Sequence, residues 1–125
     1  MDPVLPDYQG ACVTNIVPTL LAGPAAAQEW FPDEVLASRQ VVLLVLDGLG
    51  WHQLASRPEI APVLSGLAGS HITTIAPSTT ATGLTSITTG LPPGEHGMVG
   101  YRVRTHGTVL SLRFCVSKSA FTPAR

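Results

Sequence analysis

The chain has 125 residues, of which 45% are hydrophobic and only 12% are charged, and its formal net charge is −1. This length accommodates one domain with a modest core, and the large hydrophobic share argues against an intrinsically disordered chain. A net charge so close to zero argues against a surface for nucleic acid or for an anionic membrane.

The first half of the chain is expected to combine short helices with one strand. The segment from Thr14 to Leu21 has helical character and is ended by Gly23-Pro24. A second short helix is expected to reach Ser38, because its first turn holds a proline and two acids, Pro32, Asp33 and Glu34. The run Val41 to Leu46 predicts a buried strand, since it is continuously apolar and rich in β-branched residues.

The second half is expected to hold another strand, a longer helix and a hairpin. Helical pieces are predicted from Trp51 to Ala55 and from Ala61 to Leu67, and a strand from His71 to Ile75. Thr79 to Thr89 has helical length, and Gly90 is a suitable residue to end it. The last segments predict a hairpin that turns at His106-Gly107, with strands Tyr101 to Arg104 and Thr108 to Leu112.

A carboxylate follows the predicted strand directly, in the sequence Asp47-Gly48-Leu49-Gly50. Open α/β sheets place their ligands at the carboxyl edge of the strands, and a carboxylate at that edge is a natural metal ligand. An Asp that stabilises the following turn is an equally good interpretation of this motif alone.

Hydroxyl side chains are crowded between the second predicted strand and the long helix, in the segment Pro77 to Thr82. For any single hydroxyl, capping of the helix is the default interpretation. A hydroxyl at a helix N-terminus also lies where backbone N–H groups and the helix dipole stabilise negative charge. Such a position suits a nucleophilic alkoxide, and with Asp47 nearby both groups would bind one cation.

Three sequence blocks in order then resemble one family: Val45 to Gly48, Pro77 to Thr82, and Thr89 to Gly97. Together they are similar to the alkaline phosphatase superfamily and, within it, to the type I phosphodiesterase/nucleotide pyrophosphatase family. The resemblance covers roughly residues 10 to 105. It implies an α/β fold in which a mostly parallel sheet is flanked by helices.

The resemblance also implies a site. Asp47 matches a metal ligand, and Thr80 matches the nucleophile, which also binds the metal; Ser78 and Thr79 are the alternatives if the alignment shifts. The family uses two Zn²⁺ ions, which would make the hydroxyl more acidic and stabilise the leaving oxygen. The implied activity is hydrolysis of a small-molecule phosphate ester or nucleotide.

One substrate contact departs from the family pattern. Tyr101 stands where the pyrophosphatase branch usually has an asparagine that contacts a phosphoryl oxygen. Its hydroxyl can donate a similar hydrogen bond, so Tyr101 is a candidate substrate-binding residue, and a packing role is the alternative. The sequence therefore does not decide between phosphate monoesters and diesters as the substrate. His96, in the Glu-His-Gly turn, is expected to organise its loop rather than to bind a metal.

The distribution of charge limits what this chain can build. All eight acidic residues lie at or before Glu95, whereas the family takes most of its metal ligands from further downstream. We therefore expect residues 1–110 to be the N-terminal part of a catalytic domain that is truncated after the nucleophile helix and a hairpin. Residues 111–125 are expected to form a divergent tail, with disorder as one possibility. The alternative function is a non-catalytic fragment that binds a single metal weakly.

The remaining features favour an ordinary soluble chain. Cys12 and Cys115 are too few and too distant for a metal knuckle, and free thiols are the expected state. The N-terminus lacks the basic start of a secretory signal, and no apolar run is long enough to span a bilayer. We expect a cytoplasmic protein without nucleic-acid or membrane partners. A parallel sheet this short would leave an unpaired edge, which predicts aggregation.

Overall fold

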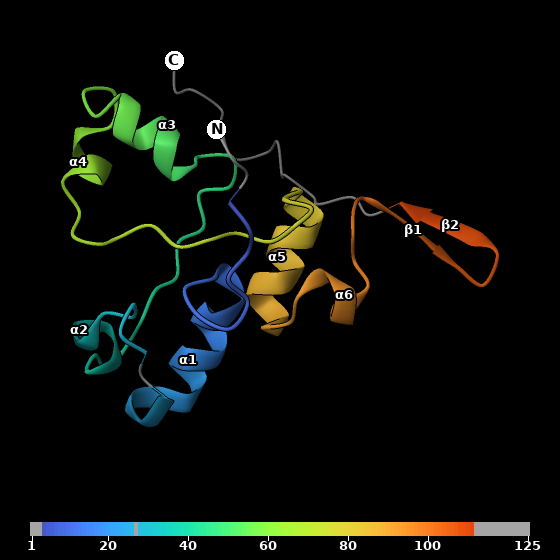
Figure 1. Cartoon of the computed structure of the whole chain (residues 1–125), viewed down its shortest axis with the longest axis horizontal. Coiled ribbons are helices and arrows are strands. Elements are labelled where there is room, and N and C mark those ends of the chain that lie inside the picture. Colours follow the sequence, from blue (N-terminus) through green and yellow to red (C-terminus); the bar gives the residue numbers. More distant parts are fainter. Residues whose placement is uncertain (1–3, 27, 112–125) are drawn as a thin grey trace, which may run out of the picture.

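The computed structural model describes residues 4–26 and 28–111, and its packing is organised around helix α5 (Thr80–Thr89). This helix packs against the 3₁₀ turn η1 (Val13–Asn15), helix α1 (Ile16–Ala22) and the short helix α6 (Pro93–His96). Figure 1 shows α5 standing beside α1, with α6 at its lower end. The helix predicted from Thr79 to Thr89 is therefore confirmed.

Gly90 ends α5 as the sequence predicts. It adopts the left-handed conformation with φ +72°, and its N–H donates to the carbonyl of Ser86. A side chain here would overlap Pro18 of α1. The glycine thus both terminates the helix and allows α1 to approach it closely.

The buried residues are few, and as many are polar as apolar. Among the residues that the structure describes, the buried apolar set is Cys12, Phe31, Ile75 and Ala81, and the buried polar set is Thr14, Thr19, Thr82 and Ser86. Small side chains on α5 let η1 and α1 approach its backbone, but they bury little apolar area each. The core is correspondingly modest.

The segment from His71 to Ile75 was predicted to be a strand and forms only an isolated parallel bridge, between Thr73 and Cys12. The Thr73 N–H donates to the carbonyl of Ala11 at 2.8 Å, and the Thr73 carbonyl accepts from the Val13 N–H at 3.0 Å. The Thr73 hydroxyl donates to the Ala11 carbonyl and accepts from the Asp7 N–H. These bonds fasten the segment before α5 to the N-terminal loop.

The remaining elements are short. The 3₁₀ turn η2 (Gly23–Ala26) follows α1, and three helices follow it: α2 (Asp33–Leu36), α3 (Trp51–Ser56) and α4 (Pro62–Ser65). These agree in place with the helices predicted before and after residues 41–46. In the described part of the chain, no helix has the length and apolar character to cross a membrane.

The hairpin is confirmed. Strands β1 (Arg102–Thr105) and β2 (Thr108–Ser111) pair antiparallel, with Arg102 opposite Ser111. The turn falls at His106 and Gly107, both with positive φ. Residues 112–125, including Cys115 and most of the predicted tail, lie outside the described residues.

The predicted mostly parallel sheet is not seen: the sheet in the described residues is the two-stranded antiparallel β1–β2 pair. Val41 to Leu46 has no regular secondary structure, and all six side chains are exposed rather than buried. Figure 1 shows this run as a drawn-out connection from α2 to α3. The physical reason is that a strand forms only with a neighbour, and no other described segment pairs with this one.

Replacing Gly90 with alanine should lower the free energy of unfolding by about 1–3 kcal/mol, because the residue needs positive φ and its Cβ would meet Pro18. Gly83→Ala is the matched control, since this helical glycine has nothing within 4 Å of an added Cβ. It should raise stability by roughly 0.5–1 kcal/mol. Urea titration followed by circular dichroism measures both. Equal effects of the two changes would contradict the close approach of α1.

Thr14→Val should raise the free energy of unfolding by about 1 kcal/mol. Thr14 is 1% exposed, and its hydroxyl has no hydrogen-bond partner among the described residues. An isosteric methyl removes that unsatisfied group. Thr73→Val is the opposite case, because the Thr73 hydroxyl makes two hydrogen bonds, and it should lower stability. The same urea titration measures both variants. A lower free energy of unfolding for Thr14→Val would show that the Thr14 hydroxyl has a hydrogen-bond partner in the unsubstituted protein.

Candidate active site

Asp47 lies in a tight turn at the end of the exposed run 41–46. The Leu49 N–H donates to the Leu46 carbonyl at 3.3 Å across this turn, and Gly48 has φ +85°. Asp47 is exposed, and its carboxylate makes no hydrogen bond or ion pair with another described residue. The motif therefore presents an available carboxylate on a turn rather than at the edge of a sheet.

Thr80 is the first residue of α5 and is half-buried. The preceding residue, Thr79, is the N-cap, but its side chain does not cap the helix and instead bonds to the Thr82 hydroxyl at 2.8 Å. The first N–H groups of an α-helix have no carbonyl partner within the helix. Thr80 thus lies beside backbone donors and the positive end of the helix dipole, the environment that an anion or a developing alkoxide favours.

A groove of about 640 Å³ lies between the start of α3 and the segment that leads into α5. Trp51 and His71 face each other across these two elements, with ring centroids 5.7 Å apart. The wall also includes the hydroxyl-bearing residues Thr73, Thr74 and Ser78. The residues that follow Asp47 in the chain and those that precede Thr80 therefore share one groove.

The two predicted site residues do not line that groove themselves, and no interaction joins them. Among the described residues, no three or more His, Cys, Asp or Glu side chains gather as metal ligands would. These residues therefore do not fit the two-zinc site that the resemblance implied, because each structural or catalytic zinc needs at least three protein ligands. Asp47 and Thr80 stay predictions as a metal ligand and a nucleophile.

His96 is engaged through both ring nitrogens. Nδ1 accepts from the Met98 N–H at 2.9 Å, so in the neutral ring Nε2 carries the proton and donates to the Ser86 hydroxyl at 2.8 Å. The imidazole thereby ties the loop after α6 to the buried face of α5. This confirms its role in organising the loop, although the sequence alone did not identify Ser86 as the partner.

Tyr101 lies between α6 and β1 and is exposed. The residues that line the groove do not include it. Its role in substrate binding stays a prediction. Trp51 and His71, in contrast, were not predicted as site residues. They lie 20 positions apart in the chain, so only tertiary contact reveals their pairing.

Comparison with protein families gives one match. The model of the family described as type I phosphodiesterase / nucleotide pyrophosphatase matches residues 41–123. The matched region contains Asp47, Thr80 and Tyr101, and it covers more than half of the chain. Neither the curated proteins nor the solved structures contain a match.

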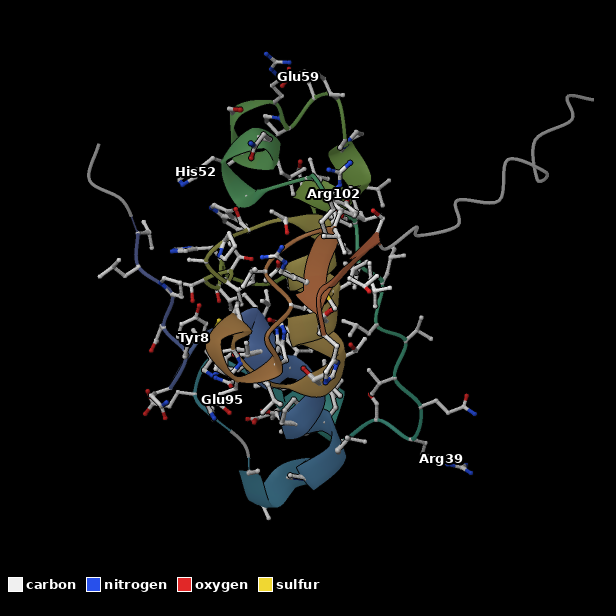
Figure 2. All side chains as sticks on the ribbon, turned by 90° about the vertical axis from the view of Figure 1, so that its right-hand side faces the viewer. Tyr8, Arg39, His52, Glu59, Glu95 and Arg102 are labelled. Atoms are coloured by element: carbon white, nitrogen blue, oxygen red, sulfur yellow. The ribbon has the colours of Figure 1, made fainter. Side chains whose placement is uncertain are left out.

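His96→Ala should lower the free energy of unfolding by about 1–3 kcal/mol, because it removes the partners of the Met98 N–H and of the Ser86 hydroxyl. Zinc affinity, measured by competition with a chromogenic chelator, should not change. His52→Ala is the control for the loss of a histidine, since His52 lies exposed on α3 at the rim of the groove, with its ring directed outward (Figure 2). Loss of zinc affinity in His96→Ala without loss of stability would show that His96 is a metal ligand.

Proposed function

We propose, from the premise that this chain belongs to the type I phosphodiesterase/nucleotide pyrophosphatase family, that it carries the phosphoryl-accepting part of a phosphoric ester hydrolase. Thr80 is the nucleophile in this proposal. The observation that carries it is the position of Thr80 at the start of α5, beside N–H groups that the Thr79 side chain leaves uncapped.

The chemistry follows from that position. The Thr80 oxygen attacks phosphorus and forms the new O–P bond, the bond from phosphorus to the leaving oxygen breaks, and the hydroxyl proton passes through solvent to that oxygen, which departs as an alcohol. Water then cleaves the phosphothreonine ester and regenerates the hydroxyl. The N–H groups at the start of α5 stabilise negative charge on the phosphoryl oxygens, because they are aimed at a site near Thr80 and have no competing carbonyl within the helix.

The groove beside Thr80 suits the organic part of an ester. Trp51 and His71 supply aromatic surface, and Ser78, two residues before Thr80, lines the same space. We propose that Tyr101 donates a hydrogen bond to the substrate. The family resemblance assigns the exposed carboxylate of Asp47 to a metal.

A second candidate function has its own support. The family resemblance assigns only Asp47 and Thr80 as metal ligands in this chain. The described ranges hold no cluster of three or more His, Cys, Asp or Glu side chains, so these two ligands alone would bind a cation weakly. A non-catalytic chain that binds one divalent ion weakly is therefore the competing proposal. The two differ in whether any ester is turned over.

The test is hydrolysis of bis(4-nitrophenyl) phosphate with and without added zinc. Under the first proposal, Thr80→Ala reduces hydrolysis to the background rate because the attacking oxygen is gone, whereas Thr80→Ser retains activity. Trapping of the phosphoryl group on Thr80, located by mass spectrometry of peptides, would identify the nucleophile directly.

Three other hydroxyls, on α5 or just before it, serve as controls for this assay. Thr88→Ala, at the exposed far end of α5, should leave the rate unchanged. Ser78→Ala and Thr79→Ala separate the alternative alignments, because only the true nucleophile abolishes turnover. Hydrolysis that survives Thr80→Ala would overturn the assignment. Complete absence of turnover together with weak binding of one zinc would favour the second candidate.

A further inference from the structure

The N-terminal loop, residues 7–12, reaches the segment that leads into α5 through the side chain of Tyr8. The Tyr8 hydroxyl accepts a hydrogen bond from the Ala76 N–H at 3.2 Å, across 68 positions of the chain. Figure 1 shows the N-terminal segment crossing the connection that leads into α5, and Figure 2 labels Tyr8 on that segment. The family match begins at residue 41, so it does not include Tyr8.

Three side-chain hydrogen bonds hold the shape of this loop. The Asn15 amide group donates to the carbonyl of Tyr8 at 3.1 Å and to the carbonyl of Gly10 at 2.8 Å. The Asp7 carboxylate accepts from the Ala11 N–H at 3.1 Å. Asn15 belongs to η1, which packs against α5. The loop that carries Tyr8 is therefore attached to the same helix that begins with the proposed nucleophile.

The bond from Tyr8 is the last one that holds the approach to α5. Thr73 is already fastened to the N-terminal loop through its backbone and its hydroxyl. Beyond Ala76, Pro77 has no N–H to donate, and residues 77–79 make no hydrogen bond to any described segment other than α5 itself. The Tyr8 hydroxyl therefore fixes the point from which the chain turns into the helix.

We propose that Tyr8 is a positioning residue for the nucleophile. It holds Ala76, and through residues 77–79 it sets where the Thr80 oxygen lies relative to the bound phosphate ester. This inference rests on the proposed function, because it concerns the same hydroxyl. Tyr8 itself does not touch the substrate in this proposal. The site would then depend on residues 7–15, which lie ahead of the region that the family model matches.

The rate, rather than substrate affinity, is the quantity that such a residue controls. Attack on phosphorus requires the reacting atoms to lie about 3–3.5 Å apart, and a displacement of roughly 1 Å costs a large factor in rate. A hydroxyl that only stabilised the fold would act differently, because its loss would lower the free energy of unfolding and leave the turnover of the folded protein unchanged.

The first test compares Tyr8→Phe with the unsubstituted chain in the hydrolysis of bis(4-nitrophenyl) phosphate with zinc. The change removes the hydroxyl and keeps the ring. We expect kcat to fall about tenfold, with KM changed by less than about twofold. Gly90→Ala is the matched control, because it lowers stability at the far end of α5 and should leave kcat unchanged. An unchanged kcat in Tyr8→Phe, or a rise in KM alone, would overturn the proposal.

The second test needs no turnover and uses NMR of the backbone amides. In Tyr8→Phe, the Ala76 N–H should exchange with solvent about tenfold faster, because it has lost its acceptor. The order parameters at Thr79 and Thr80 should fall. The Thr73 N–H is the internal control, since the Ala11 carbonyl still holds it. Unchanged exchange at Ala76, or unchanged order at Thr80, would contradict the positioning role.

Asn15→Asp tests the same link from the other end of the loop, and it remains informative where Tyr8→Phe fails to fold. Aspartate keeps the shape of the side chain but lacks the N–H groups that hold the carbonyls of Tyr8 and Gly10. It should also lower kcat and speed the exchange of the Ala76 N–H. No effect on either quantity would show that the loop does not position Tyr8.

The two proposals fail in different ways. If the unsubstituted chain hydrolyses no ester, the proposed function is wrong and Tyr8 has no catalytic role, whereas the NMR measurement still decides whether Tyr8 holds the start of α5. If the unsubstituted chain is active and Thr80→Ala is not, but Tyr8→Phe retains full kcat, only the positioning role is wrong.

Discussion

The packing of α5 against η1 and α1 is the interaction on which the rest of the structure depends. It is made possible by small residues: Ala81, Thr82 and Ser86 are buried on α5, and Gly90 allows Pro18 to approach. Close contact between backbones compensates in part for the small apolar area that such residues bury. The same face receives the His96 side chain through Ser86, which ties the following loop to the helix.

This arrangement supports the two halves of the candidate site unequally. Thr80 begins the helix that is most firmly held, so its position relative to the N–H groups of α5 is well defined. Asp47 instead follows an exposed run that no described segment covers, and it sits in a turn held by one backbone hydrogen bond. The metal-binding role proposed for Asp47 would require a rigid support, and the described residues give this turn none beyond that hydrogen bond.

The exposed run is the least supported part of the candidate site. A continuous apolar segment suits a strand that is covered on both faces, and the same segment left uncovered is a template for pairing with another chain. Among the described residues the run from Val41 to Leu46 has no such cover, and no further ligating side chains gather around the acid that follows it, Asp47.

Features encoded within a few residues were predicted correctly. The α5 helix, its termination at Gly90, the turn at His106-Gly107 and the loop-organising role of His96 all follow from local conformational preferences or short-range hydrogen bonds. The groove was not predicted, because its aromatic pair, Trp51 and His71, joins segments 20 residues apart. The partner of His96, ten residues away on another element, was missed for the same reason.

The sequence by itself determined the family, the likeness of Thr80 to a nucleophile, and the helix that presents it, since these depend on residue identity and short spacing. Only the tertiary structure decided that Val41 to Leu46 is exposed and that Asp47 lies on a turn. An apolar run specifies that a segment prefers to be covered, but burial and strand pairing require a second segment within reach. In the described chain, α5 has such partners and the run before Asp47 has none.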